Sequence, residues 1–585
     1  MRTRYPRTPH LPWSEGATPD DVRADTTACF DGRDVVVTEK LDGENTTLYR
    51  DALHARSLDS AHHPSRAWIK AYHERVRGQI PDGVRVSGEN LFAKHALAYT
   101  DLESWFYLFS VWEGDHCHDW DATVAFGARI GAPTPRVLYR GPFDEKKIRA
   151  LPLDRSRQEG YVVRTAEGFA YTDFASHVAK FVRKDHVTTD VHWARAPVLE
   201  NGRSPRALLW DVRGGVRANA TDLARVLGLE APSLAGREPH APAEARIAAT
   251  EDALDAIGRF GDARLEGVIA ALLAPLPRAD VAPLLLPRLG ARLARRISDL
   301  VGLARALREP FPDELRAGGL RSMARAADLG VLHALAGATT KPGVEADLVR
   351  WSELVASDAG LLSTAPLAAL RAGARASFAA LPPRRAQRAW SAALELWVDG
   401  KIRSVDEAIA TTHAAQREDR ASVVLMVGPS GSGKSTLTRA TFADHAVISL
   451  DDRREARGER GDQSENAAVL TRALGDLGAL LDAGRQVVWD ATSLVRAQRR
   501  LVLDAARRRG ALGSLVVFAR APAELARRNA ARPHPVPVAV LEQQLHRFTP
   551  PYPGEADRVL YVGADDAITD TAGDLFTDVL ETDTP

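Results

Sequence analysis

The chain has 585 residues, of which 45% are hydrophobic and 26% are charged, so it is too long for one core and we expect three or four folded units. Lysine plus arginine and aspartate plus glutamate both total 77. This balance excludes the global basic field of a protein that coats nucleic acid, but not a local binding groove. The sequence contains no run of about 20 apolar residues, the length that a membrane span needs. The first residues lack the apolar segment of a secretory signal. The two cysteines, Cys29 and Cys117, are too few for a disulfide framework or a cysteine zinc site, so we expect a cytoplasmic protein without a membrane partner.

Lysine is rare in this chain, so the positions of its lysines are informative. Only ten of the 77 basic residues are lysine. A sequence that uses arginine by default should keep lysine where an amine is needed. The surroundings of Lys40, Lys180 and Lys434 indicate such a need.

Residues 1–195 are predicted to form a mostly β, α+β domain. Short β-branched or aromatic runs bounded by Gly, Asp or Pro predict strands at Val35–Val37, Trp105–Trp112, Tyr161–Val163 and Val178–Val182. The first run leads to Lys40-Leu-Asp-Gly43, which predicts a lysine at the end of a strand and a tight turn after it. An amine is nucleophilic only when it is neutral, so Lys40 would need a partly closed pocket with cationic neighbours that lower its pKa.

Further features of this stretch suit a nucleotide pocket around Lys40. In chain order they are a carboxylate at a strand end that could meet a ribose (Glu89), an aromatic strand able to stack a purine (Phe106–Trp112), a carboxylate at a strand start suited to a metal (Glu159), and a lysine-bearing strand suited to a phosphate (Val178–Val182). Each feature alone is common in an ordinary sheet. The whole order is far rarer.

This order resembles the covalent nucleotidyltransferases, which include the ATP-dependent ligases and the capping guanylyltransferases, and it is most similar to the RNA ligase 2-like group over about residues 30–190. The resemblance implies an ATP-grasp-like ligase fold and a lysyl-AMP formed at Lys40. It also implies a set of ATP contacts: ribose at Glu89, adenine stacked on Phe109, metal at Glu159, and phosphate at Lys180 and Arg56. The group often has lysine at the position of Val182, and Arg183 or Lys184 could supply that phosphate contact instead.

Residues 196–415 are predicted to be an all-α central region. The composition shifts to Ala, Leu and Arg with helical spacing, as in Leu286–Ile297 and Leu367–Leu381, and breaks are predicted at Ala231–Pro242 and Leu381–Arg385. We find there no complete set of residues for removing a phosphoester, whether metal-binding His and Asp, an aspartate nucleophile or paired histidines. The central region is therefore either a helical module that reads RNA or a spacer.

Residues 416–585 are predicted to be an α/β domain with a parallel sheet, because strands and helices alternate. The expected strands are Val423–Val427, Ala446–Leu450, Gln486–Trp489 and Ser514–Phe518. The first strand runs into a G-x-x-x-x-G-K-S phosphate loop that a helix follows. We expect nucleotide contacts from its backbone amides and polar side chains, at Gly428, Ser430, Gly431, Gly433, Lys434, Ser435 and Thr436. Lys434 should reach the β- and γ-phosphates, and the Ser435 hydroxyl should meet Mg²⁺.

Charged residues after the later strands predict the rest of a phosphotransferase site. Asp451 follows the second strand, where a carboxylate can accept a proton from an attacking hydroxyl. Asp490 follows the third strand and is suited to the Mg²⁺ shell. Arg528 and Arg532 lie four residues apart, which places them on one face of a helix as a clamp for a transferring phosphoryl group.

These residues resemble the phage polynucleotide 5′-kinase family over about 150 residues, in family order. The resemblance implies that Asp451 is the general base on a 5′-hydroxyl, that Arg454 touches the phosphate of the acceptor, and that Arg532 stabilises the transferred group. The family often has asparagine where this chain has Ser493.

The two resemblances together predict a bifunctional RNA end-repair enzyme that uses ATP and Mg²⁺ or Mn²⁺, because the 5′-phosphate made by the kinase is the substrate of the ligase. The expected partner is RNA with broken ends, tRNA included. Sealing needs a free 3′-hydroxyl, so a separate 3′-phosphatase or cyclic phosphodiesterase is expected as well. Two alternatives stay open: a DNA-directed ligase and kinase, and a small-molecule or toxin-type P-loop kinase fused to an inactive, RNA-binding ligase-like domain.

Overall fold

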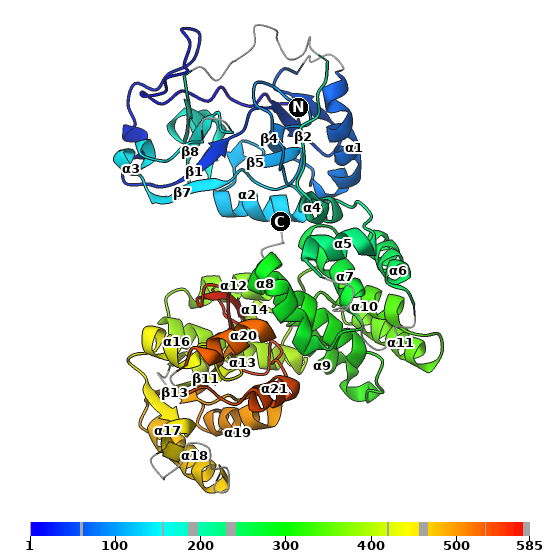
Figure 1. Cartoon of the computed structure of the whole chain (residues 1–585), viewed down its shortest axis with the longest axis vertical. Helices are drawn as coiled ribbons and strands as arrows, with labels where there is room; N and C mark the ends of the chain where they lie inside the picture. Colours follow the sequence, from blue (N-terminus) through cyan, green and yellow to red (C-terminus); the bar gives the residue numbers. More distant parts are fainter. Residues whose placement is uncertain are drawn as a thin grey trace. The chain divides into compact units, whose positions relative to one another are not determined.

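The structure, a computed structural model, describes residues 2–58, 63–154, 157–184, 197–229, 241–417, 421–455, 466–532 and 534–576. They form two compact units (Figure 1): unit 1 consists of Met1–Val226 and Gly258–Leu265, and unit 2 of Leu227–Ile257 and Glu266–Pro585. The boundary predicted near residue 195 lies outside the described residues, as does most of the break predicted at Ala231–Pro242. Across the described parts of the chain, no helix has both the length and the apolar character that a membrane span requires.

Unit 1 contains two antiparallel sheets, with strand orders β10-β8-β1-β7 and β3-β2-β4-β5-β6-β9. The strands are β1 (Asp34–Lys40), β2 (Glu44–Leu48), β3 (Leu53–Ala55), β4 (Val84–Asn90), β5 (Phe106–Glu113), β6 (His116–Cys117), β7 (Val137–Pro142), β8 (Gly160–Thr165), β9 (Phe169–Ala170) and β10 (Val178–Val182). All four predicted strands of this region are confirmed. Since β1 belongs to one sheet and β2 to the other, the short turn between them joins the two sheets directly after Lys40.

Helices cover one face of the second sheet of unit 1. The helices before residue 228 are α1 (Ala67–Val76), α2 (Trp120–Ile130), α3 (Glu145–Arg149), α4 (Ala207–Arg213) and α5 (Ala220–Leu227), with short 3₁₀ turns at Ala28–Phe30, Pro64–Arg66, Arg77–Gln79 and Tyr171–Ser176. Ile69 and Val76 of α1 and Ile130 of α2 pack with Val86 and Leu108 of the sheet in one buried cluster. The α+β character predicted for this region is confirmed.

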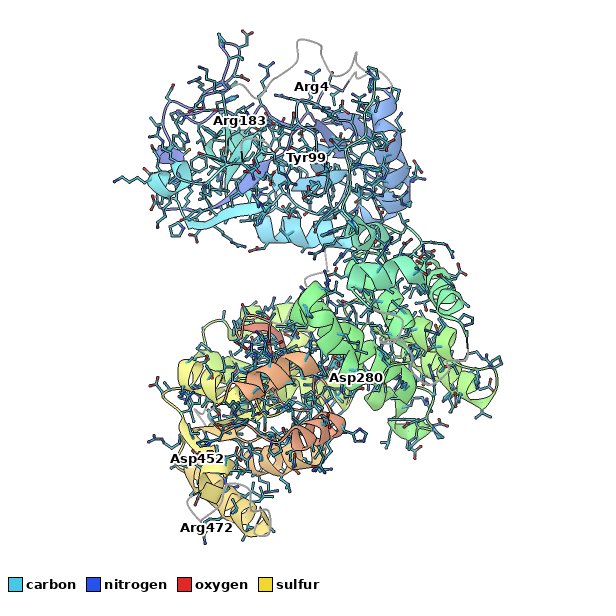
Figure 2. The ribbon with its side chains drawn as sticks, in the orientation of Figure 1. Arg4, Tyr99, Arg183, Asp280, Asp452 and Arg472 are labelled. Atoms are coloured by element: carbon cyan, nitrogen blue, oxygen red, sulfur yellow. The ribbon has the colours of Figure 1, made fainter. Side chains whose placement is uncertain are left out.

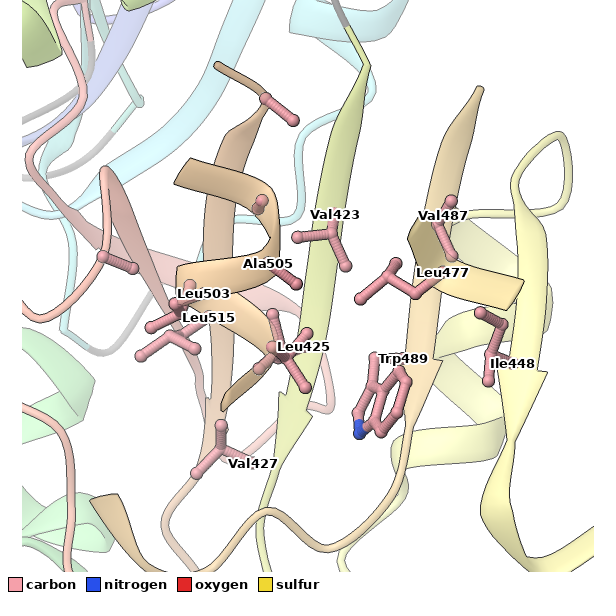
Figure 3. Packing of buried hydrophobic residues seen from close by; sticks show 14 of the residues in the cluster. Val423, Leu425, Val427, Ile448, Leu477, Val487, Trp489, Leu503, Ala505 and Leu515 are labelled. Atoms are coloured by element: carbon pink, nitrogen blue, oxygen red, sulfur yellow. The ribbon is translucent and has the colours of Figure 1, made fainter. Parts of the chain in front are cut away.

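Unit 2 contains a six-stranded sheet of order β12-β13-β11-β14-β15-β16. The strands are β11 (Ser422–Val427), β12 (Ala446–Ser449), β13 (Gln486–Asp490), β14 (Leu512–Phe518), β15 (Arg558–Val562) and β16 (Ile568–Ala572). The predicted parallel sheet is confirmed, and only the edge strand β16 is antiparallel to its neighbour. Its core is apolar: Val423 and Leu425 of β11 and Trp489 of β13 are buried in one cluster with Leu503 and Leu515 (Figure 3).

The remaining helices begin at residue 243. They are α6 (Ala243–Ala256), α7 (Gly261–Leu273), α8 (Arg278–Ala306), α9 (Asp313–Ala324), α10 (Leu329–Thr339), α11 (Val344–Asp358), α12 (Ala368–Phe378), α13 (Pro383–Val398), α14 (Val405–Thr411), α15 (His413–Arg417), α16 (Lys434–Thr441), α17 (Leu450–Glu455), α18 (Asn466–Asp482), α19 (Arg496–Arg507), α20 (Pro522–Ala530) and α21 (Val538–Arg547). The predicted helical centre is confirmed, and so is the break between α12 and α13. The helix predicted at Leu286–Ile297 is kinked within α8 at Gly290, whose φ is 77°.

Buried ion pairs join the central helices to the edge of the unit 2 sheet. The Arg295 guanidinium on α8 donates to Asp570 of β16 at 2.6 Å and to Asp299, one turn further along α8, at 3.4 Å. Asp299 has no exposed surface and also accepts from Arg278 at 2.5 Å. Burial by itself would lower the pKa of Arg295, but Asp570 and Asp299 outweigh it and the pKa lies well above its usual value. The arginine therefore stays charged inside the unit.

Replacing Asp299 by asparagine is expected to destabilise unit 2 strongly, because Arg278 then loses its carboxylate partner inside the protein. Removing one partner of a buried ion pair costs about 3–5 kcal/mol of unfolding free energy. Calorimetric unfolding of the full chain measures this loss. Asp347→Asn is the matched control, since Asp347 forms an exposed pair with Arg350 and such a pair contributes at most about 1 kcal/mol. Equal unfolding temperatures for the two variants would contradict the assigned role of the buried network.

Candidate active sites

A cavity of about 590 Å³ lies where the two sheets of unit 1 meet. Its lining includes residues from four strands and one loop of the predicted ligase site: Lys40 at the end of β1, Arg56 after β3, Glu89 of β4, Phe109 of β5 and Lys180 of β10. The volume lies within the range of small-ligand sites in proteins. The fold thus brings together residues that are up to 140 positions apart in the sequence, as an ATP site there would require.

Strand register explains why the two lysines share this cavity. Thr38 of β1 pairs with Val162 of β8, and Val162 pairs with Lys180 of β10. Side chains alternate along a strand, so Lys40 lies on the same face as Thr38, and all four residues line the cavity. On the opposite face, Tyr161 stacks on Phe181 at 4.9 Å within the core.

The Lys40 ammonium is held by carboxylates rather than by cations. Its Nζ donates to Glu159 Oε2 at 2.5 Å, and the Glu159 side chain is only 8% exposed. Burial acts to lower the pKa of Lys40, but the charges of Glu159, Glu89 and Asp42 outweigh it, so the pKa lies above its usual value. The sequence predicted cationic neighbours that would lower the pKa of Lys40. Lys180 is such a neighbour, but the shift appears at Lys180, whose pKa is lowered by burial and then by the charge of Lys40. Lys40 is therefore a charged amine that must lose a proton before it can attack.

Glu89 lies beside the turn that follows Lys40. Its Oε1 accepts from the backbone N–H of Gly43 at 3.1 Å. Burial and then the nearby charge of Glu159 raise the pKa of Glu89 to about 7, although Lys40 opposes the shift. This carboxyl can therefore gain or lose a proton near neutral pH.

The turn itself is rigid. The Asp42 backbone N–H donates to the Tyr99 hydroxyl at 2.9 Å, and the Asp42 carboxylate accepts from the Leu97 N–H at 2.8 Å (Figure 2 labels Tyr99). Gly43 passes so close to β4 that a Cβ there would lie 2.5 Å from the carbonyl oxygen of Asn90. The glycine of the Lys-Leu-Asp-Gly motif is required by this approach.

Gly160→Ala is expected to reduce adenylylation of the protein at least about 100-fold, since displacements of 1 Å in a catalytic site have that effect. A Cβ on Gly160 would lie 1.9 Å from the carbonyl oxygen of Phe181, so β8 and β10 would separate and displace Glu159 and Lys180. The assay is transfer of labelled AMP to the protein. Gly78→Ala is the matched control, because a Cβ on Gly78 meets nothing within 4 Å. Wild-type adenylylation by Gly160→Ala would mean that the β8–β10 register does not set the site.

The N-terminal segment forms a wall of the cavity that the sequence argument missed. Tyr5 and Thr8 line the cavity, and the Tyr5 ring contacts the Phe109 ring edge-on, with centroids 5.2 Å apart. The segment runs along β10: Lys180 donates its N–H to the Pro9 carbonyl at 2.9 Å, and Leu11 donates to the Lys180 carbonyl at 2.8 Å. It has no hydrophobic periodicity. Trp120 and Phe169 complete the aromatic lining, and only their residue type could have suggested them.

The residues at the departure from the ligase pattern do not reach the cavity. Val182 is buried and donates its backbone N–H to Ser14 Oγ at 2.9 Å. Arg183 donates its Nε to the carbonyl of Gln158 at 2.9 Å. Neither Arg183 nor Lys184 lines the cavity. This geometry therefore does not support a phosphate contact from Arg183 or Lys184. Lys180 and Arg56 remain the candidates for contacting the phosphates.

In unit 2 the predicted phosphate loop connects β11 to α16. Gly428, Ser430, Gly431 and Gly433 belong to the loop, and Lys434, Ser435 and Thr436 form the first turn of α16. Lys434 donates its Nζ to the carbonyls of Gly428 and Pro429, at 2.9 and 2.7 Å. Burial lowers the pKa of Lys434 to about 8. The Gly428 N–H at the start of the loop donates to the carbonyl of Thr492, which lies just after β13, at 2.9 Å.

The predicted magnesium residues meet beside this loop. The Ser435 hydroxyl donates to Asp490 Oδ2 at 3.1 Å. Burial raises the pKa of Asp490, and the charges of Asp451 and Asp452 contribute in the same direction. A serine hydroxyl and one carboxylate fit Mg²⁺, which takes one or two carboxylates and completes its shell with phosphate oxygens and water. Asp451 is exposed near the start of α17, and Arg454 lies in that helix, with its side chain outside the described residues.

The two predicted clamp arginines do not share a helix face as expected, because α20 ends at Ala530 and Arg532 lies beyond it. Their surroundings also differ. Within the described part of the chain, Arg532 has a buried Nη1 with no hydrogen-bond partner, and its charge contributes to lowering the pKa of Lys434. Arg528 lies beside Gly433 but donates to both carboxylate oxygens of Asp566 at 3.0 Å and to Glu524 at 2.8 Å. Arg528 must therefore exchange or share these partners to bind a nucleotide. The sequence argument missed Asp566, which lies in the β15–β16 hairpin with a φ of 64°.

Ser493, the departure from the kinase pattern, occupies a left-handed backbone position with a φ of 46°. Asparagine adopts this conformation more readily than serine. The position is held from outside, because Arg499 donates its Nη1 to the Ser493 carbonyl at 3.1 Å and pairs with Glu555 at 2.5 Å. The loop after β13 is thus kept in place in spite of the less suitable residue.

Comparisons with known proteins agree with both halves of this description. Residues 33–182 match the family model described as RNA ligase, and residues 423–551 match the family model described as AAA domain. No curated protein gives a significant match to the chain. A gluconokinase from Sinorhizobium meliloti 1021 is 22% identical over 26% of this chain and 86% of its own, with a TM-score of 0.20. Chaetomium thermophilum Kti12 in complex with ADP-AlF3 is 17% identical over 25% of this chain and 90% of its own, with a TM-score of 0.21.

A Naegleria gruberi RNA ligase mutant with ATP and Mn is 15% identical over 28% of this chain, with a TM-score of 0.21, and the match spans 53% of that ligase. This chain therefore aligns with about half the length of that RNA ligase structure. The family matches agree with the two resemblances at the level of an RNA ligase region and a P-loop region. The chain joins a region of the RNA ligase family type to a P-loop region of the AAA domain type.

Proposed function

We propose that the chain is a bifunctional RNA end-repair enzyme, an ATP-dependent polynucleotide 5′-hydroxyl kinase and an ATP-dependent RNA ligase in one protein. The observation that carries the proposal is the presence of two candidate nucleotide sites in one chain. One has Lys40, which lines a cavity of about 590 Å³ and is paired with the buried Glu159, and the other has a phosphate loop with Ser435 bonded to Asp490. The product of the second site is the substrate of the first.

In the ligase step, neutral Lys40 attacks the α-phosphorus of ATP. The N–P bond forms as the bond from the α-phosphorus to the bridging oxygen breaks, and pyrophosphate leaves. Lys40 first loses its ammonium proton to solvent; in the free protein that ammonium is bonded to Glu159 Oε2 at 2.5 Å. AMP then moves from Lys40 to the 5′-phosphate of the RNA, and the 3′-hydroxyl displaces it to form the phosphodiester. Glu159 would hold Mg²⁺ or Mn²⁺, which would neutralise phosphate charge and favour the loss of the proton from Lys40.

In the kinase step, the 5′-hydroxyl of the RNA attacks the γ-phosphorus of ATP. Asp451 accepts the hydroxyl proton, and the bond from the γ-phosphorus to ADP breaks. Lys434 and Arg532 stabilise charge on the transferred group, and Arg454 holds the acceptor phosphate. Positioning and charge stabilisation of this kind account for most of the catalysis in phosphoryl transfer. Ser435 and Asp490 would hold Mg²⁺, which would neutralise charge on the phosphates.

One assay with two labels tests the proposal. ATP labelled at the α-phosphate should give a covalent protein adduct that survives denaturation and that 5′-phosphorylated RNA discharges, and ATP labelled at the γ-phosphate should label 5′-hydroxyl RNA. Discharge by nicked DNA but not by RNA would favour the DNA-directed alternative. An unlabelled protein together with transfer to a small molecule would favour the P-loop kinase with an inactive ligase region.

The proposal includes a limit at the 3′ end. We expect the protein to seal a stem-loop break with 5′-hydroxyl and 3′-hydroxyl ends in the presence of ATP and Mg²⁺, but to stall when the 3′ end is a 2′,3′-cyclic phosphate. Sealing should return when a 3′-phosphatase that also opens cyclic phosphates is added, since a ligase of this kind needs a free 3′-hydroxyl. A denaturing gel of the products checks this, and efficient sealing of cyclic ends by the protein alone would show a healing activity in the chain.

A further inference from the structure

A second large cavity, of about 680 Å³, lies within unit 2 between the central helices and the kinase-like fold. One wall comes from α8 and α9 and the segment that connects them, which includes Phe311. The other wall comes from the first turn of α19 and from residues 548–555 after α21. None of the residues predicted for the phosphate site lines this cavity.

Two segments, α21 and the loop after Asp490, connect the phosphate site to the cavity. The Ser430 N–H of the phosphate loop donates to Gln544 Oε1 of α21 at 2.7 Å, and Phe548 of the cavity follows one helical turn later, a rise of about 6 Å. The loop after Asp490 continues to Arg496, which also lines the cavity. The two paths are bonded to each other, because Thr549 donates its N–H to the Leu494 carbonyl at 3.0 Å. The cavity is therefore connected to the phosphate loop through the end of α21 and through the loop after β13.

The lining combines aromatic rings with a cation. Phe311 and Tyr552 are partly exposed, and the Arg278 guanidinium lies over the Tyr552 ring at 3.3 Å. Among the basic lining residues, Arg278 and Arg499 are neutralised by Asp299 and Glu555. Arg496 is exposed, and no carboxylate of the described chain pairs with it. Aromatic faces next to an uncompensated cation suit a nucleobase with its phosphate.

We propose that this cavity binds a nucleotide of the acceptor RNA downstream of the 5′-hydroxyl, with the base against Phe311 or Tyr552 and the phosphate at Arg496. The inference rests on the proposed kinase function and extends it to the substrate class: the acceptor is a strand of several nucleotides rather than a single nucleotide. It also makes α8 and α9 part of the acceptor surface, which gives the central helices a role in RNA binding.

The test compares a short and a long acceptor. Adenosine 3′-monophosphate occupies only the first position, whereas a ten-nucleotide 5′-hydroxyl RNA extends into the cavity. For Arg496→Ala, and for the charge reversal Arg496→Glu, we expect KM for the ten-nucleotide RNA to rise about tenfold, with kcat and the KM for adenosine 3′-monophosphate unchanged. Arg496 is exposed, so these variants should fold. Phe311→Leu, which removes the aromatic face, should shift KM in the same selective way.

Arg500→Ala is the matched control. Arg500 lies one turn along the same helix, is exposed and pairs with Asp504 rather than facing the cavity, so its loss should leave both KM values unchanged. An unchanged KM for the long RNA in both Arg496 variants overturns the inference while the kinase function stands. An equal change for both acceptors also overturns it, because Arg496 would then act at the reaction centre. A wild-type protein that phosphorylates neither acceptor overturns the proposed function and the inference together.

Discussion

Lys40→Ala is expected to abolish the AMP adduct of the protein completely. The Lys40 amine is the nucleophile that the lysyl-AMP step requires, and an alanine has no nucleophile to replace it. Lys40→Arg should fail as well, although it keeps the ion pair with Glu159, because a guanidinium stays protonated and cannot attack. Mass spectrometry of the protein after incubation with ATP measures the adduct and its position.

The control for this result lies in the same unit. Lys70→Ala removes an exposed lysine of α1 and should form the adduct at the wild-type rate. Phosphorylation of 5′-hydroxyl RNA by Lys40→Ala should also stay near wild type, because the phosphate loop belongs to unit 2. AMP found on another lysine would refute the assignment of Lys40.

Asp451→Asn and Lys434→Ala are expected to remove most of the 5′-kinase activity and to leave the sealing of 5′-phosphorylated RNA intact. For Asp451→Asn the loss should be about 10²–10⁴-fold in kcat, the usual contribution of a general base. Asp452→Asn is the matched comparison, because Asp452 is the next residue of the same turn and its backbone N–H is bonded to Ser449 at 3.2 Å. If Asp451→Asn keeps the wild-type rate and Asp452→Asn does not, the base is Asp452.

The kinase reaction should also depend on pH through Lys434. Burial lowers the pKa of this amine to about 8, so the free protein carries a protonated Lys434 below that pH and a neutral one above it. Phosphate oxygens bind the protonated form. The KM for ATP in the kinase reaction should therefore be flat below about pH 8 and rise above it. A KM that stays constant up to pH 9.5 would show that nearby carboxylates keep the amine protonated.

Much of both sites was determined by the sequence, because their motifs are local. The phosphate loop needs only a strand, a run of glycines and a helix in succession, and all three lie within residues 422–441. The lysine turn is also local, since Lys40 to Gly43 lie between the consecutive strands β1 and β2. Strands with β-branched or aromatic runs were predicted for the same reason: the period of the side chains is contained in the run itself.

The environment of these residues was decided only by the tertiary structure. The carboxylates that hold Lys40 charged come from β4 and from the residue before β8, and sheet register, which the sequence does not display, places them there. The wall formed by Tyr5 and the engagement of Arg528 by Asp566 likewise depend on segments with no pattern of their own. From the sequence, the central helices could be either a spacer or a helical module that reads RNA, because the spacing of arginines along a helix does not show which distant residues they contact. Their place against the sheet depends on pairs such as Arg295 with Asp570, 275 residues apart, whose burial is set by packing and not by local sequence.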